Sequence, residues 1–281
     1  MKTLHHVLAP AKLNLFLHIT GRRPDGYHLL QSVFMLIDWC DTLHFEKRPG
    51  GAISREDLTV PLPADDLITR AAKLLQQHTG CTQGVHIAVD KQIPAQAGMG
   101  GGSSDAASCL LALNQLWNLQ LSLEALEKLG LQLGADVPFF LRGRNAWVEG
   151  VGEKITPIAL PPAQFWVIKP SAGVETAQIF KHADLQRATK PATISVFAAQ
   201  AYDFGHNDLQ PVAQAMCSEV TQALQVLKAA GMNGKMTGSG SAVFAHCMPS
   251  TLPIVVPDHW QVRKCSNLDV HPLQGWATSE S

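Results

Sequence analysis

Charged residues are scarce in this sequence, and their signs nearly cancel. Of 281 residues, 16% are charged, and 22 Lys and Arg against 23 Asp and Glu leave a formal net charge of -1. Sequence-independent binding of nucleic acid needs a strongly basic surface that displaces counterions from the phosphates. The charge balance therefore argues against a nucleic-acid partner and favours a small molecule.

The sequence also lacks long apolar runs and closely spaced cysteines. No stretch approaches the roughly 20 apolar residues that a membrane helix requires, and residues 1–6 lack the apolar core of a signal peptide. The six cysteines form no C-x-x-C pair, and the 12 histidines form no H-E-x-x-H motif. We therefore expect a cytoplasmic protein with reduced thiols, no membrane attachment and no tightly bound transition metal.

Hydrophobic periodicity predicts strands and helices in two lobes. In residues 13–19 apolar side chains alternate with others, which indicates a strand with one buried face and puts Lys12 and Asn14 together on the other face. Further strands are predicted at residues 29–37, 42–47, 85–89, 165–168 and 241–245. Helices are predicted from a cap at Asp65 or Asp66 to about residue 78, after the glycine loop, after a cap at Ser122, and over 208–230. Glycine-rich turns near Gly150 suggest lobes of residues 1–150 and 151–281. The sequence does not predict an oligomeric state.

The strongest functional signal is the segment G-M-G-G-G-S-S at residues 98–104, between a predicted strand and an amphipathic helix. Glycines let the backbone approach phosphate oxygens closely, and the helix N-terminus adds partial positive charge. The segment lacks the Gly-Lys-Ser/Thr of a Walker A loop and the third glycine of a dinucleotide fingerprint. On its own it is equally consistent with a flexible turn and a Ser or Asp helix cap.

Two further segments gain meaning in combination with this loop. T-G-S-G-S at residues 237–241 is by itself a tight turn before an apolar strand, and beside the first loop it is a candidate second wall of a phosphate site. L-G-A-D-V-P at residues 133–138 places one carboxylate, Asp136, in an apolar setting. Asp136 either caps the helix that Pro138 opens or acts with a nearby cation, for which Lys12 is the natural choice.

Three motifs in this order resemble those of the GHMP kinases. They are P-A-K-L-N at residues 10–14, G-G-G-S-S at 100–104 and T-G-S-G at 237–240. Within that superfamily, residues 9–16, 26–28, 100–107, 133–138 and 149–153 resemble the branch that phosphorylates 4-diphosphocytidyl-2-C-methyl-D-erythritol in non-mevalonate isoprenoid biosynthesis. The resemblance implies an α+β, two-lobed fold, with a ribosomal-protein-like α/β N-terminal lobe, a ferredoxin-like C-terminal lobe and the active site in the cleft between them.

The resemblance also implies a role for each matching residue. Lys12 and Asp136 would be the catalytic pair, acting on the 2-hydroxyl of the methylerythritol group. The residues that would contact ATP are Asp66, Lys91, Gly98, Gly100, Gly101, Gly102, Ser103 and Ser104. Asn14 and Thr176 would line the same pocket as the catalytic pair, and Tyr27, His28 and Phe180 would hold the cytidine end of the acceptor, where aromatic rings can stack on the base. Gly238 and Ser239 would also contact the acceptor. Mg²⁺ would arrive with ATP, because the sequence shows no dedicated cage of carboxylates.

The sequence departs from the family pattern at three places. Asp66 stands where the family usually has asparagine, and P-A-Q-A-G at residues 94–98 replaces a run of glycines. Pro249, Pro253 and Pro257 fall where a ferredoxin-like lobe has its final helix. Because proline breaks helices, we expect an extended loop there.

Three alternative functions are weighed against this one. The first is another GHMP kinase, acting on homoserine, mevalonate or a sugar; residues 26–28 and 133–138 argue against it. The second is a nucleotide-binding sensor without catalysis, which the presence of Lys12 and Asp136 disfavours. The third, a dehydrogenase-type nucleotide fold, is disfavoured by the missing glycine of the dinucleotide fingerprint.

Overall fold

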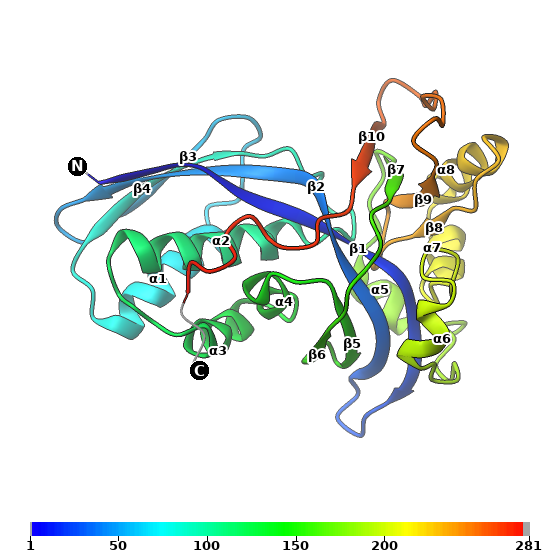
Figure 1. The fold of residues 1–281 in the computed structure, drawn as a ribbon, viewed down its shortest axis with the longest axis horizontal. Helices are drawn as coiled ribbons and strands as arrows, with labels where there is room; N and C mark the ends of the chain where they lie inside the picture. Colours follow the sequence, from blue (N-terminus) through cyan, green and yellow to red (C-terminus); the bar gives the residue numbers. More distant parts are fainter. Residues whose placement is uncertain (1, 278–281) are drawn as a thin grey trace.

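Two long strands run through the molecule and join its two halves (Figure 1). β1 (Thr3–Arg22) and β2 (His28–Arg48) pair antiparallel in a computed structural model that describes residues 2–277. The sequence predicted two separate strands within β2, which was wrong, because β2 is continuous and pairs with β1 on both sides of an irregular stretch between Leu36 and Cys40. The single buried face predicted for residues 13–19 was also wrong: residues 9–19 are buried on both faces, since helices cover one part of the strand and the second lobe covers another.

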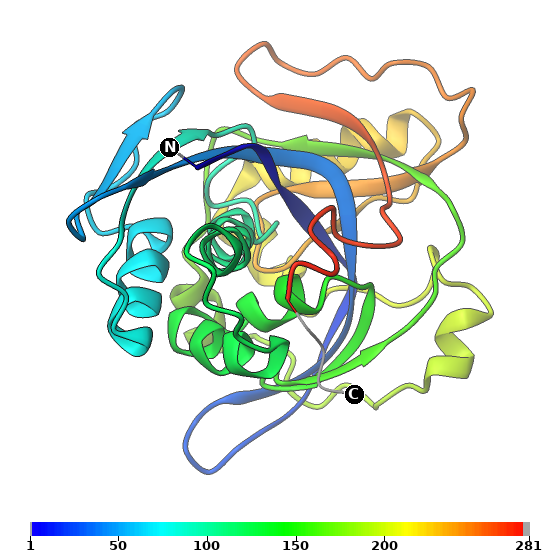
Figure 2. The same cartoon turned by 60° about the vertical axis from the view of Figure 1, so that its left-hand side comes forward.

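The first lobe is a six-stranded sheet with four helices packed against it (Figures 1 and 2). The strand order is β3 (Ile53–Asp57), β4 (Gly84–Asp90), β2, β5 (Ala146–Gly150), β6 (Lys154–Pro157), with β1 also paired to β2. The helices are α1 (Leu67–Thr79), α2 (Gly101–Leu116), α3 (Leu123–Leu133) and α4 (Val137–Arg142). Among the strands named within residues 2–277, β3 and β4 alone pair in parallel, and the others pair antiparallel.

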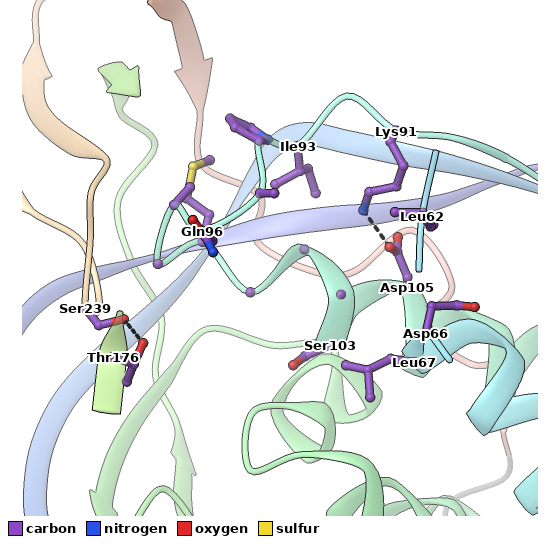
Figure 3. Close-up of a pocket in the computed structure, with 18 of the residues that line it drawn as sticks. Leu62, Asp66, Leu67, Lys91, Ile93, Gln96, Ser103, Asp105, Thr176 and Ser239 are labelled. Carbon is purple, nitrogen blue, oxygen red and sulfur yellow. Dashed lines mark hydrogen bonds and ion pairs between the residues drawn. The ribbon is translucent and has the colours of Figure 1, made fainter. Parts of the chain in front are cut away.

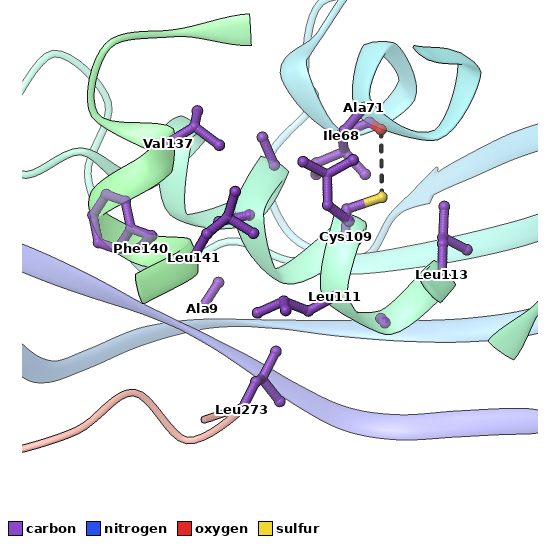
Figure 4. Close-up of a cluster of buried hydrophobic side chains, with 14 of the residues drawn as sticks. Ala9, Ile68, Ala71, Cys109, Leu111, Leu113, Val137, Phe140, Leu141 and Leu273 are labelled. Carbon is purple, nitrogen blue, oxygen red and sulfur yellow. Dashed lines mark hydrogen bonds between the residues drawn. The ribbon is translucent and has the colours of Figure 1, made fainter. Parts of the chain in front are cut away.

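Helix α2 forms the centre of this lobe. Its side chains are buried over nearly its whole length, polar Ser108 and Asn114 included, so the amphipathic character predicted for the helix after the glycine loop was wrong. Neighbouring elements cover α2 on all sides, which leaves it almost no solvent-facing stripe. Figure 4 shows Cys109 and Leu111 of α2 among residues of α1, α4 and β1, with the Cys109 thiol directed at the Ile68 carbonyl oxygen, 3.6 Å away. This packing holds the N-terminus of α2 firmly in place at the edge of the lobe.

The second lobe is a four-stranded antiparallel sheet with helices on it. Its strand order is β10 (Gln261–Ser266), β7 (Gln164–Lys169), β9 (Val243–Cys247), β8 (Lys235–Met236), and its helices are α5 (Thr176–Lys181), α6 (Ile194–Ala198), α7 (Gln210–Met216) and α8 (Ser218–Ala229). The single helix predicted over 208–230 was wrong: Cys217, with φ -141° and ψ 103°, is extended and separates α7 from α8. The break lets Val220 and Leu227 of α8 join the apolar core of this lobe.

The end of the chain departs from a plain division into two consecutive lobes. Residues 248–260 form neither helix nor strand, which confirms the expectation drawn from the three prolines. After β10 the chain returns to the first lobe, where the amide of Leu268 donates to the Leu36 carbonyl at 2.9 Å (Figure 1). β6, which comes after Gly150, also belongs to the first sheet. The lobe boundary at Gly150 stays a prediction. No helix within residues 2–277 is both long and apolar enough to span a membrane.

Candidate active site

A cavity of about 570 Å³ lies between the lobes at the N-terminus of α2 (Figure 3). The first lobe lines it with residues around the start of α1 and with residues 93–103, and the second lobe with residues 174–176 and 239–240. Of the residues predicted from sequence, the cavity wall contains Asp66, Lys91, Gly98, Gly100, Gly101, Gly102, Ser103, Thr176 and Ser239. The wall does not include Ser104, Gly238, Lys12, Asp136, Asn14, Tyr27, His28 or Phe180.

The first turn of α2 faces this cavity without a side-chain cap. Gly100 is the N-cap residue, with φ 71° in the left-handed region that glycine favours, and no side chain accepts from the helix amides. The Ser or Asp cap considered from the sequence is therefore absent: Ser104 is fully buried and Asp105 bonds to Lys91. Uncapped amides and the helix dipole make this end a suitable place for an anion.

The two glycine loops pack directly against each other. The amides of Ser241 and Ala242 donate to the carbonyls of Gln96 and Ala97 at 3.1 and 3.2 Å. A β-carbon on Gly98 would collide with the Thr237 carbonyl oxygen, so this close approach requires glycine. The segment at residues 237–241 is thus a second wall beside the first loop.

The hydroxyls of Ser239 and Thr176 hydrogen-bond across the second lobe's part of the cavity, 2.6 Å apart (Figure 3). Ser239 belongs to the second glycine loop, and Thr176 is the first residue of α5. This bond ties the loop to α5 and keeps both hydroxyls at the cavity.

Asp66 is already occupied by contacts within the protein. Its carboxylate accepts from the amides of Ile68 and Thr69 at 2.7 and 3.1 Å, which confirms the predicted cap of α1. It also pairs with the guanidinium of Arg55, which in turn bonds Asp57. Arg55 gives a physical reason for an acidic residue at position 66. With an asparagine there, the Arg55 guanidinium would keep Asp57 as an ion-pair partner and lose the second carboxylate.

Lys91 is likewise held by neighbours that sequence reasoning missed. Its ammonium pairs with Asp41 and, at 2.6 Å, with Asp105 (Figure 3). Burial opposes the charge on Lys91, but Asp105 and Asp41 together outweigh it and raise the lysine pKa. Burial raises the pKa of Asp105 to about 7, with Asp41 adding to the shift and Lys91 opposing it. Asp41 also accepts from the amides of residues 92 and 93, so the cluster anchors the start of the glycine loop.

Lys12 and Asp136 approach each other beside the glycine loop. The ammonium of Lys12 lies 3.7 Å from a carboxylate oxygen of Asp136, and the Lys12 amide donates to the Met99 carbonyl at 3.0 Å. Lys12 is buried, whereas the side chain of Asp136 is 33% exposed. Asp136 makes no capping bond to α4, so its carboxylate is not used as a helix cap. Burial lowers the pKa of Lys12, and Asp136 opposes this shift.

Asn14 organises the surroundings of Lys12. Its side-chain oxygen accepts from the Lys12 ammonium, and its side-chain nitrogen donates to the Ser32 hydroxyl at 2.9 Å. Its backbone amide donates to the Thr237 hydroxyl at 2.9 Å. The contact between the Lys12 and Asn14 side chains confirms that the two project together, and Asn14 also links Lys12 to the second glycine loop, which was not predicted.

The remaining predicted residues lie at the start of β2 and in α5. The rings of His28 and Phe180 lie 5.1 Å apart between centroids, with a tilt of 35°. Tyr27 is 65% exposed. The structure therefore brings two of the three predicted aromatic contacts together and leaves Tyr27 open to solvent.

Comparison with known proteins shows the family to which this chain belongs. Residues 66–144 match the family described as GHMP kinases N terminal domain, and residues 190–253 match GHMP kinases C terminal. A protein of Paracidovorax citrulli (strain AAC00-1), named 4-diphosphocytidyl-2-C-methyl-D-erythritol kinase, is 62% identical with 100% of both chains covered. The chain belongs to the GHMP kinase family.

Further relatives place this GHMP kinase within one branch and one fold. A protein of the same name from Albidiferax ferrireducens is 63% identical over 100% of this chain and 98% of its own. A crystal structure of 4-(cytidine 5'-diphospho)-2C-methyl-D-erythritol kinase superposes with a TM-score of 0.77 and 32% identity, covering 95% of this chain and 99% of that one. A homoserine kinase from Cytophaga hutchinsonii shares the fold, with a TM-score of 0.70, 15% identity and 96% of each chain covered.

Proposed function

We propose that this GHMP kinase transfers the γ-phosphate of ATP to the 2-hydroxyl of 4-diphosphocytidyl-2-C-methyl-D-erythritol. The observation that carries the proposal is the Lys12–Asp136 pair, 3.7 Å apart, next to a glycine loop that opens an uncapped helix. The names and full-length identity of the relatives support this particular acceptor.

The phosphates of ATP would lie at the first turn of α2. The amides of this turn have no capping side chain, and the walls bring in Ser103 from the first lobe and Ser239 from the second. Phosphoryl transfer requires mainly that two substrates be positioned and that negative charge be neutralised. A loop held from both lobes serves the first need, and the helix N-terminus with Lys12 serves the second.

The chemical step can be written with the residues at hand. The oxygen of the 2-hydroxyl bonds to the γ-phosphorus, the bond from that phosphorus to the oxygen bridging to the β-phosphate breaks, and ADP leaves. The hydroxyl proton passes to Asp136, whose carboxylate is accessible. The Lys12 ammonium stabilises the negative charge that develops on the attacking oxygen.

Mg²⁺ is proposed to enter with ATP. In the described part of the chain, no group of three or more His, Cys, Asp or Glu residues has the arrangement to hold a metal ion. Ser104 does not suit the ion either, because it is fully buried and is not part of the cavity wall. The phosphates of ATP would therefore supply most of the ligands.

The proposal is tested by measuring ADP release with Mg·ATP and three separate acceptors: the cytidyl substrate, homoserine and mevalonate. We expect turnover with the cytidyl substrate alone. Turnover with another acceptor would retain the kinase and refute the proposed substrate. ATP binding without turnover of any acceptor would favour the nucleotide-binding sensor.

A size series at Gly102 tests the phosphate site. Gly102 lines the cavity, and a β-carbon there would have ordinary contact at 3.5 Å with Leu67, so larger residues fit the free protein. We expect Gly102→Ala to raise the KM for ATP slightly and Gly102→Leu to raise it by about 10-fold or more, because the side chain would occupy phosphate space. Gly101 is less suitable, since a β-carbon there would lie 3.0 Å from Ile93.

The control in this series is the melting temperature of each variant without nucleotide. It should not fall, because alanine and leucine are better helix formers than glycine. An unchanged KM for ATP in a stable Gly102→Leu protein would contradict a phosphate role for this turn.

A further inference from the structure

Arg187 lies in the loop after α5, and its guanidinium donates five hydrogen bonds, one for each N–H group. Its Nε donates to Nε2 of His28 at 3.2 Å. Its Nη atoms donate to four backbone carbonyls: Phe180 at 3.2 Å, His182 at 2.7 Å, Ala183 at 3.4 Å and Leu185 at 3.0 Å. A guanidinium has five N–H donors in a fixed planar fork, so all of them are used here.

These hydrogen bonds connect the two residues of the aromatic pair, His28 and Phe180, through Arg187. Phe180 and His182 stand at the C-terminal end of α5, where the last carbonyls of a helix lack intrahelical partners. Arg187 supplies donors to those carbonyls and, with the same group, reaches His28 at the start of β2. The spacing of 5.1 Å between the His28 and Phe180 rings is therefore held by one side chain.

The contact also decides which nitrogen of His28 carries hydrogen. An arginine can only donate, so Nε2 of His28 must accept and must be without hydrogen. The ring is then neutral with its hydrogen on Nδ1, since a protonated ring would have hydrogen on both nitrogens. Burial, and then the positive charges of Arg187 and Arg22, lower the pKa of His28, which is consistent with a neutral ring.

We propose that Arg187 is a positioning residue for base recognition, which fixes His28 as an Nδ1–H donor and holds Phe180 beside it. This inference rests on the proposed function, with the cytidine end of the acceptor at His28 and Phe180 as the family resemblance implies. A donor on Nδ1 suits cytosine, whose O2 and N3 are both acceptors. Uracil carries a hydrogen on N3 and cannot accept there.

The first test is a long-range ¹H–¹⁵N NMR spectrum of the unmodified protein, with the His28 signals assigned by their loss in a His28→Asn variant. We expect a protonated Nδ1 and an unprotonated Nε2. Because isolated neutral histidine prefers hydrogen on Nε2, this result requires a cause in the protein. A His28 ring with hydrogen on Nε2 would overturn the inference.

The second test is the kinetics of Arg187→Lys, which keeps the charge and loses the planar fork. We expect the KM for the cytidyl acceptor to rise about 10-fold, with kcat and the KM for ATP within about twofold. The matched control is Lys190→Gln, an exposed cation in the same loop, which should change none of these values. Equal acceptor KM values in the two variants would refute the role of Arg187.

A pair of His28 variants covers the case in which Arg187→Lys is unstable. Asparagine can place an amide donor near the position of Nδ1, and glutamine places its amide near Nε2, so His28→Asn should retain more acceptor affinity than His28→Gln. The reverse order would contradict the inference. Failure of the proposed function has a different signature: no turnover of the cytidyl acceptor by the unmodified protein, with His28 still showing the Nδ1–H tautomer.

Discussion

Replacing Asp136 with asparagine is expected to lower kcat by about three orders of magnitude and to leave the KM for ATP within about twofold. Asparagine keeps the shape of the side chain and can still orient a hydroxyl, but it cannot take the proton. Since Asp136 makes no capping bond to α4, the exchange should not disturb that helix. Steady-state rates with the cytidyl acceptor and Mg·ATP measure the effect.

The matched control for this variant is Asp258→Asn, an exposed acid in the loop between β9 and β10. It should turn over like the unmodified protein. If Asp136→Asn does the same, Asp136 is not the proton acceptor. An intermediate loss of about 10-fold would indicate that the carboxylate chiefly orients the hydroxyl.

The pH dependence of activity in Asp136→Asn tests independently whether Lys12 and Asp136 interact electrostatically. Lys12 acts as a cation, so activity should fall as pH rises through its pKa, which burial lowers from 10.5. Asp136 opposes that shift, and its replacement by a neutral amide removes the opposition. The alkaline limb of the residual activity in Asp136→Asn should therefore move to lower pH. A limb that stays in place would argue against coupling between the two groups.

Replacing Lys12 with methionine is expected to lower kcat by a similar factor, about a thousand, with a small effect on the KM for ATP. Methionine fills a similar volume and removes the positive charge that stabilises the attacking oxygen. The fold should tolerate the change, because a buried charge is costly and Lys12 is only 4% exposed. Melting temperature and rate should be measured on the same preparation.

Lys235→Met is the control for this experiment. Lys235 is also buried, at 6% exposure, and burial lowers its pKa to about 8. Its ammonium donates to the Phe204 carbonyl at 2.7 Å, whereas that of Lys12 lies 3.7 Å from Asp136. The same chemical change at this lysine should leave kcat within about twofold. A loss of equal size in both variants would mean that removing any buried lysine disturbs the protein, and would remove the support for a catalytic Lys12.

The predictions from sequence succeeded where a signal lies within a few neighbouring residues. The glycine loop at residues 98–104, the Asp66 cap and the proline-broken segment at 248–260 follow from backbone sterics and local hydrogen bonds, which adjacent residues define. At Asp136 the local pattern left a helix cap and a carboxylate beside Lys12 as alternatives, and the structure shows the second.

Element boundaries were less predictable, because packing overrides local pattern. Periodicity alone showed a helix over residues 208–230, yet Cys217 is extended so that α8 can face the second sheet. The two predicted strands within residues 29–47 are one, since β1 pairs with β2 on both sides of the irregular stretch between Leu36 and Cys40. Such choices are made by contacts with elements far along the chain.

The amino-acid order, through its motifs and their resemblance to a family, was sufficient for the two-lobed GHMP kinase fold, for two glycine loops that lie side by side and for the approach of Lys12 to Asp136. Only the folded chain shows that Lys91 is held by Asp41 and Asp105, that Asp66 pairs with Arg55, and that Arg187 reaches His28. Each of these contacts joins residues separated by 11 to 159 positions. Local sequence patterns cannot predict these contacts, because the partners come within bonding distance only after the strands and helices that contain them have packed together.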